Sequence, residues 1–227
     1  AGSGALTFGV PSSPGVPDVL AQHTVTLPFN DLAALEAAMD ELGDQVACVI
    51  TEPVAGNMNC IPSVEGYLEG MRELCTRHGA VLIFDEVMTG FRVHPGGAQG
   101  LYNVTPDLTC LGKIAGGGLP VGVYGGRAEI MACIAPEGPV YQAGTNSGNP
   151  LSVAAGLATL QELQADSGAV YCHLEGLGAR LQAGIEKALQ ESNVRGVVQR
   201  VGSMLTLFFT ECSVVNVEDV TPQAVER

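Results

Sequence analysis

Short, strongly apolar runs alternate with an amphipathic stretch in the first half of this chain. The runs are VACVIT (46–51), AVLIFDEV (80–87) and DLTCLGK (107–113). Residues 65–79 lie between the first two runs, carry apolar side chains at helical spacing and end at a glycine. Apolar runs of this length, separated by a helix, are typical of parallel strands buried on both faces. The sequence therefore predicts an α/β fold, with a mainly parallel central sheet and helices on both of its faces.

The remaining segments add helices and a hairpin to this sheet. Asn30-Asp31 precedes an amphipathic stretch that ends at Gly43, as expected of a capped helix. Residues 150–164 and 168–192 are predicted to form two more helices, and LPVGVYGG is a further predicted strand. Residues 194–211 are predicted to form two paired strands around a glycine.

The composition divides the chain into three predicted parts. Residues 1–17 contain several glycines and three prolines, which exclude a regular helix or a central strand. A loop of this length is commonly a lid or a binding loop. We expect a lid loop over 1–17, a partial large domain over 18–166, and the start of a small C-terminal α+β domain over 167–227.

Bulk composition excludes several classes of protein. The chain has 227 residues, of which 46% are hydrophobic and 15% charged, enough apolar material for a buried core. A net charge of −14 disfavours a nucleic-acid partner, because phosphate contacts need clustered Lys and Arg. No apolar run reaches the ~18 residues of a membrane span. Seven scattered cysteines and four scattered histidines show no metal spacing, so we expect no metal site and a reducing compartment.

Asp85 and Glu86 close the apolar run 80–87. A carboxylate at the end of a buried strand is costly unless it is paired or hydrogen-bonded. Asp85 can therefore face a cationic group of a ligand, because ligands gather at the carboxyl edge of such sheets. It can also be a capping or ion-paired residue on a solvated edge.

Lys113 follows an apolar run and precedes three glycines, although the chain has only two lysines. An apolar surrounding disfavours the ammonium form and favours a nucleophilic amine, as Schiff-base chemistry with an aldehyde requires. The glycines would let the backbone approach a flat ligand. A phosphate-binding P-loop is not matched, since the glycines follow the lysine. A solvated lysine in a flexible turn is the other reading.

Three polar turns are weaker candidates. Asn57 and Asn59 in GNMNC could donate to a ligand oxygen or simply serve the turn. Thr145 and Ser147, in AGTNSGNP ahead of a predicted helix, would suit an anion, but an ordinary helix start has the same pattern. Arg92 is a possible carboxylate partner or an exposed turn residue.

These motifs together resemble the class III, fold-type I aminotransferases that use pyridoxal 5′-phosphate (PLP). The resemblance is carried, in chain order, by EPV-x-G-N, DEV-x-x-G-F-R and K-x-x-G-G-G-x-P, and it covers nearly the whole chain up to about residue 165. The opening glycine- and proline-rich loop is similar to that of the aminomutase branch of the family.

The resemblance implies a role for each matching residue. Lys113 would bond covalently to the cofactor aldehyde and later shuttle protons. Asp85 would pair with the pyridinium nitrogen, Val87 would pack on a ring face, and Asn57 would donate to the ring hydroxyl. Thr145 would bind the phosphate of the partner subunit's cofactor across the interface of a homodimer.

The resemblance also implies an activity. The aminomutase branch converts glutamate 1-semialdehyde to 5-aminolevulinate for tetrapyrrole synthesis, passing through the pyridoxamine form of the cofactor. The alternative is a class III ω-aminotransferase with a separate keto-acid acceptor. A lid over residues 1–17, with Ser3 near its gating end, would retain the intermediate. The implied location is the cytoplasm or a plastid stroma.

The two ends of the sequence look cut, since the chain lacks an initial methionine and stops where a helix begins. The family's upstream Ser-Gly-Thr phosphate turn and its ring-stacking aromatic residue are missing. We therefore expect an internal segment of a longer protein, inactive when alone.

Overall fold

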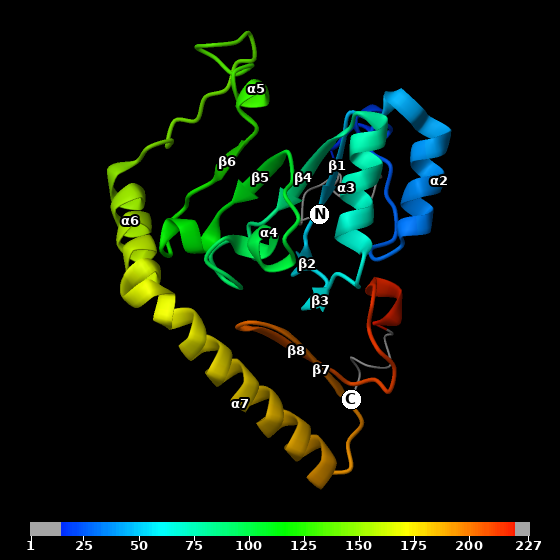
Figure 1. Cartoon of the computed structure of the whole chain (residues 1–227), viewed down its shortest axis with the longest axis vertical. Helices are drawn as coiled ribbons and strands as arrows, with labels where there is room; N and C mark the ends of the chain where they lie inside the picture. The colour runs from blue at the N-terminus through cyan, green and yellow to red at the C-terminus, as the bar shows by residue number, and fades with distance from the viewer. Residues whose placement is uncertain (1–14, 221–227) are drawn as a thin grey trace.

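The computed structural model of the protein describes residues 15–220, which form an α/β fold around one four-stranded sheet (Figure 1). The strand order is β1-β4-β5-β6. The first three strands are parallel and β6 is antiparallel to β5, so the predicted mainly parallel sheet is confirmed. The four strands are β1 (Cys48–Thr51), β4 (Val81–Asp85), β5 (Leu108–Leu111) and β6 (Val123–Gly126).

Helices α2 (Leu32–Leu42) and α3 (Tyr67–His78) lie side by side beside the sheet (Figure 1). The Asp31 side chain caps α2 by accepting a 2.8 Å hydrogen bond from the Ala34 N–H, as its place before the amphipathic stretch predicts. Gly79 follows the last residue of α3. Both helices therefore begin and end close to the residues that the sequence indicates.

The main core lies between these helices and β4. Leu82 and Phe84 of β4 are fully buried, and Leu68 and Met71 of α3 pack in the same cluster. Burying one such side chain stabilises the fold by about 1.5–3 kcal/mol. This packing holds β4 in place and thereby sets the position of its last residue, Asp85.

β1 differs from the buried strand that its sequence predicts. Ile50 is 49% exposed and Cys48 is also exposed. The reason is position, because β1 is hydrogen-bonded only to β4 and forms one edge of the described sheet.

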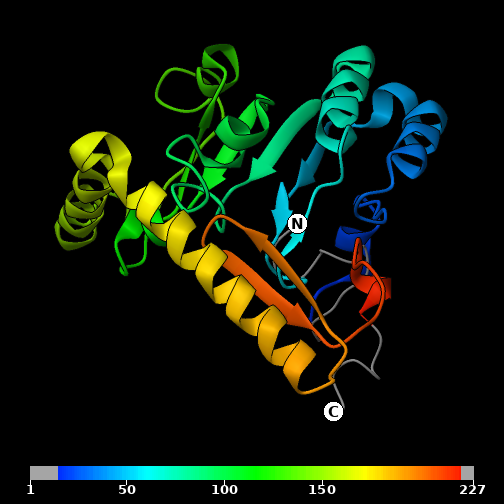
Figure 2. The ribbon, with the colours of Figure 1, turned by 60° about the horizontal axis from the view of Figure 1, so that its bottom comes forward.

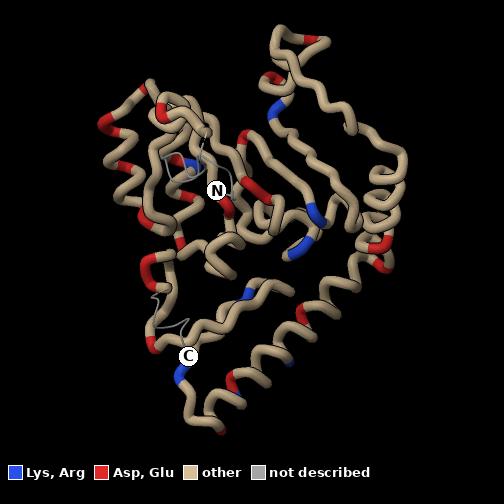
Figure 3. The backbone as a smooth tube through the Cα atoms, turned by 180° about the vertical axis from the view of Figure 1, so that it is seen from behind, with Lys and Arg blue, Asp and Glu red and all other residues tan. Residues whose placement is uncertain are grey.

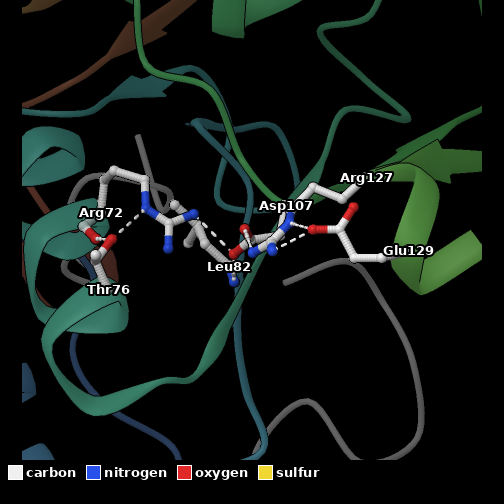
Figure 4. A network of polar contacts seen from close by, with 6 residues as sticks. All are labelled: Arg72, Thr76, Leu82, Asp107, Arg127 and Glu129. Atoms are coloured by element: carbon white, nitrogen blue, oxygen red, sulfur yellow. Dashed lines mark hydrogen bonds and ion pairs between the residues drawn. The ribbon is translucent and has the colours of Figure 1, made fainter.

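A buried carboxylate joins the elements at the amino edge of this sheet (Figure 4). Asp107, which precedes β5, forms ion pairs with Arg72 of α3 at 2.7 Å and with Arg127 after β6 at 3.0 Å. Its carboxylate also accepts a 2.7 Å hydrogen bond from the Leu82 N–H. One side chain therefore ties α3, β4, β5 and the end of β6 together.

The C-terminal part consists of one long helix and a hairpin. α7 (Ala169–Glu191) lies along β7 (Val197–Val201) and β8 (Met204–Phe208), which pair antiparallel as predicted (Figure 2). Arg200 on β7 forms hydrogen bonds of 2.8 and 2.6 Å with the two carboxylate oxygens of Glu175 on α7. This pair fixes the helix on the hairpin.

α6 (Pro150–Gln164) precedes α7, and a kink separates them at Asp166 and Ser167, both with positive φ. The predicted boundary between domains falls at this kink. The remaining elements are α1 (Asp18–Ala21), η1 (Gly43–Gln45), β2 (Val54–Ala55), β3 (Ile61–Pro62), α4 (Gly97–Tyr102), η2 (Lys113–Gly116), α5 (Ala128–Met131), η3 (Ala165–Gly168) and η4 (Val217–Asp219).

Two further observations bear on the sequence predictions. Within residues 15–220, no helix combines the length and the apolar character that crossing a membrane demands. Most of the predicted lid, including Ser3, lies outside the described residues.

Candidate functional site

The carboxyl ends of β4 and β5 bring together the two strongest candidates from the sequence. Asp85 ends β4 and lies opposite Cys110 in β5, and Lys113 follows two residues after β5 ends. A Cβ atom on Gly112, the residue before Lys113, would lie 3.3 Å from Cγ1 of Val87. Asp85, Val87 and the backbone of Lys113 therefore occupy one edge of the sheet.

The Asp85 carboxylate is half-buried and only partly engaged. Its Oδ1 accepts a 3.1 Å hydrogen bond from the Val87 N–H, and Oδ2 has no hydrogen bond within residues 15–220. Burial, followed by the charge of Asp85, raises the pKa of the Cys110 thiol. The carboxylate therefore acts electrostatically across to β5 and retains one free oxygen.

Lys113 has an unusual backbone conformation for its residue type. Its φ is +45°, in the left-handed region that costs a non-glycine residue roughly 1–2 kcal/mol. Its side chain is exposed and forms no hydrogen bond or ion pair with the described part of the chain. Strained residues that the surrounding structure holds in place are concentrated at functional sites.

The absence of a partner is uncommon among the basic residues of this acidic chain. Six of the nine Lys and Arg side chains that the structure describes form ion pairs, and Arg92, Lys113 and Arg180 do not. Figure 3 shows that the basic residues are few and dispersed among many more acidic ones. Lys113 is therefore one of three Lys and Arg residues in 15–220 that form no ion pair.

Asn57, the predicted donor to a ring hydroxyl, is engaged with a carboxylate. Its Nδ2 donates to Oε1 of Glu52 at 3.1 Å, and the Gly56 N–H donates to Oε2 at 2.8 Å. A Cβ on Gly56 would approach Met88 to 2.8 Å, which places this turn against the segment after Val87. The turn therefore borders the site, and Glu52 orients the Asn57 amide.

Glu86 was not singled out by the sequence patterns, although it is the most completely buried carboxylate near the site. Its side chain is 0% exposed and accepts four hydrogen bonds from Thr89, Ala98 and Gln99. Its position in an apolar run was the one sequence signal for this role, because a buried carboxylate is costly unless it is hydrogen-bonded or paired. Those partners lie as far as 13 residues away, where no local pattern reveals them.

One of the three glycines after Lys113 has a packing role, and the predicted clearance for a flat ligand stays a prediction. Gly117 has φ +57° and approaches α6 so closely that a Cβ would lie 2.5 Å from the Ala155 carbonyl oxygen. A Cβ on Gly156 of α6 would likewise overlap the Ala115 carbonyl. Gly117 and Gly156 therefore let η2 and α6 pack backbone to backbone, whereas a Cβ on Gly118 would meet nothing within 4 Å.

Thr145 is not brought near Lys113 by the described contacts. Residues 141–149 are exposed throughout and run between α5 and α6, away from the ends of β4 and β5 (Figure 1). Asn149 caps α6 by accepting from the Leu151 and Ser152 N–H groups. No described contact within residues 15–220 therefore places Thr145 at the Lys113 site of the same chain.

Arg92 lines a cavity of about 250 Å³ between the segment after β4, the start of α7 and the hairpin turn. Its Nε donates to the Met88 carbonyl oxygen at 2.8 Å. No group of three His, Cys, Asp or Glu suited to a metal ion is found in residues 15–220.

Known proteins resemble this chain over almost all of its length. The family model "Aminotransferase class-III" matches residues 4–227. Glutamate-1-semialdehyde 2,1-aminomutase 2 of Brevibacillus brevis is 55% identical over all 227 residues, which make up 52% of that protein.

Solved structures of such enzymes share the fold. An ω-transaminase from Sphaerobacter thermophilus is 35% identical with a TM-score of 0.88, over 94% of this chain and 49% of its own. A glutamate-1-semialdehyde aminomutase from Pseudomonas aeruginosa, in complex with PMP, is 34% identical with a TM-score of 0.78, over 93% of this chain and 48% of its own. The chain thus spans about half the length of these relatives.

Proposed function

The chain belongs to the class-III aminotransferase family, and we propose that it catalyses the conversion of glutamate 1-semialdehyde to 5-aminolevulinate in tetrapyrrole synthesis with PLP as cofactor. The observation that carries this proposal is the 55% identity, over the whole chain, to a glutamate-1-semialdehyde 2,1-aminomutase. The fold supports it, being that of the fold-type I PLP-dependent transaminases.

The residues at the sheet edge fit PLP. The cofactor needs an acid beside its pyridinium nitrogen and an amine beside its aldehyde, and this edge offers Asp85 and Lys113 with no ion-pair partner for either in residues 15–220. The other lysine, Lys187, lies on α7 with its Nζ 3.6 Å from Glu191. Lys113 is therefore the better candidate for the covalent link.

We assign a role to each residue of the site. Asp85 would hold a proton on the pyridinium nitrogen, since a nearby carboxylate favours the charged ring. Bound there, PLP would supply an electron sink for the substrate carbon that loses its proton. The Lys113 amine would accept and return that proton, Val87 would pack on the ring, and Asn57, oriented by Glu52, would donate to the ring hydroxyl.

The remaining parts of the site would come from elsewhere in the assembly. We propose that Thr145 serves the cofactor of a partner subunit in a homodimer, because its segment is exposed and lies apart from Lys113. The loop 1–17, with Ser3, would act as a lid that closes the site. The large domain would comprise residues 18–166, and the small domain would begin at residue 167. All seven cysteines are free, which supports the cytoplasm or a plastid stroma.

A class III ω-aminotransferase is the second candidate. The observation in its favour is the TM-score of 0.88 to the Sphaerobacter thermophilus ω-transaminase. The two reactions differ in one requirement, because an aminotransferase needs a separate keto-acid acceptor and the aminomutase does not.

The deciding experiment supplies the full-length protein, in its PLP-bound form, with glutamate 1-semialdehyde and no amino acceptor. The proposal predicts 5-aminolevulinate as the product, at a rate that added keto acid does not raise. Product formation that depends strictly on a keto acid would assign the protein to the ω-aminotransferases.

A further inference from the structure

We propose that Glu86 is a positioning residue that sets the relative placement of Asp85 and Lys113. This inference rests on the proposed function, since it assigns both residues to the cofactor site. Glu86 itself points away from that site, because successive side chains at a strand end alternate between faces. Its influence on the chemistry is therefore indirect.

Every partner of the Glu86 carboxylate donates to it. Oε2 accepts from the Thr89 hydroxyl at 2.8 Å and from the Ala98 N–H, and Oε1 accepts from the Gln99 N–H at 3.1 Å and from Gln99 Nε2 at 3.0 Å. No Lys or Arg pairs with it in the part of the chain that the structure describes. Four donors without an acceptor suit an ionised carboxylate and leave no place for an amide.

The backbone of the neighbouring segment is shaped around this carboxylate. Gly97 has φ +66°, and a Cβ atom at that position would overlap the Glu86 carboxylate. Thr89 lies in the loop 86–96 that leads from β4 into α4, and Gln99 lies in the first turn of α4. One side chain therefore holds the loop closed and keeps the start of α4 against the end of β4.

The same carboxylate links the two strands that carry the site. Gln99 Nε2, besides contacting Glu86, donates to the Thr109 hydroxyl of β5 at 3.2 Å. The Glu86 N–H donates to the Cys110 carbonyl at 2.9 Å. Asp85 is the residue before Glu86, and Lys113 lies three residues after Cys110. The hydrogen bonds from Gln99 to Glu86 and to Thr109 thus connect the backbone next to Asp85 with the strand that leads to Lys113.

The test compares Glu86→Gln with the wild-type holoenzyme. The amide would direct an NH₂ group at backbone N–H donors, so the loop should loosen without a change in side-chain size. We expect faster hydrogen exchange at Ala98 and Gln99 in the apoprotein, a Kd for PLP raised about 10- to 100-fold, and a shifted visible spectrum of the bound cofactor.

Asp107→Asn is the matched control, because it disrupts a buried carboxylate at the opposite edge of the same sheet. It should lower stability without altering the cofactor spectrum. Gln99→Leu, which removes the link to Thr109 and keeps the carboxylate, should raise the Kd for PLP a few-fold and can replace Glu86→Gln if that variant does not fold.

Wild-type Kd and spectrum in a Glu86→Gln protein whose 98–99 amides exchange faster would overturn the inference and leave Glu86 a purely structural residue. A wild-type protein that fails to bind PLP would overturn the proposed function and this inference together. Titration of the wild-type protein with PLP separates these two outcomes, and the exchange measurement shows whether the loop has loosened in the variant.

Discussion

The two edges of the central sheet differ in whether their charged side chains form ion pairs. At the amino edge, the Asp107 carboxylate is buried against Arg72 and Arg127, so its charge is balanced within the chain (Figure 4). At the carboxyl edge, Asp85 ends β4 and Lys113 follows the adjacent strand β5, and neither has an ion-pair partner in residues 15–220. One edge therefore holds the fold together, and the other is the edge at which we propose that the cofactor binds.

The contrast extends to the buried carboxylates behind each edge. Asp107 is balanced by cations, whereas Glu86 is held by neutral donors alone. A buried charge without a counter-ion is the costlier arrangement, even when hydrogen-bonded. This costlier arrangement, at Glu86, lies next to the residues that we assign to the cofactor site.

The largest expected effect comes from Lys113→Arg. The guanidinium keeps the positive charge but does not deprotonate near neutral pH, so it can neither bond to an aldehyde nor relay a proton. Formation of 5-aminolevulinate should fall by about 10³-fold or more. Lys187→Arg is the control and should retain wild-type turnover; retention of activity by Lys113→Arg would remove the basis of the site assignment.

Asp85→Asn should have the next largest effect. An amide cannot hold the pyridinium proton by charge, so kcat should drop roughly 100-fold while the protein remains folded. Steady-state kinetics and circular dichroism measure the two quantities. An activity within a few-fold of wild type would mean that the reaction does not require the Asp85 carboxylate.

Asp107→Asn tests the other edge. Loss of the carboxylate leaves Arg72 without its ion-pair partner, whereas the half-exposed Arg127 keeps its ion pair with Glu129. We therefore expect the free energy of unfolding to fall by about 2 kcal/mol. Urea unfolding measures this change, and PLP affinity should remain at the wild-type value. A large loss of affinity with unchanged stability would reverse the roles assigned to the two edges.

The smallest effect concerns pH. Burial opposes ionisation of Asp107, but hydrogen bonds from Arg72, the Leu82 N–H and Arg127 outweigh it and lower its pKa. A lowered pKa contributes stability that is present above the unfolded value of about 3.9 and is lost as the pH falls through the folded pKa. Unfolding midpoints between pH 7 and 3 should therefore decline less steeply in Asp107→Asn than in wild type; parallel curves would contradict this account.

The sequence predicted what depends on neighbours along the chain. The helix caps, the mainly parallel strands indicated by apolar runs, and the location of Asp85 and Lys113 at or just after strand ends all follow from local pattern. The sequence did not reveal the Glu86 cluster or the use of Gly117 against α6, because both depend on residues brought together by folding. The exposure of β1 was missed for the same reason, since an edge strand and a central one share the same apolar signature.

The most direct test is borohydride reduction of the holoenzyme followed by mass mapping of its peptides. The assignment of the covalent link to Lys113 predicts a single stable adduct of the cofactor on that residue. An adduct on Lys187, or PLP bound without any reducible link to a lysine, would contradict it.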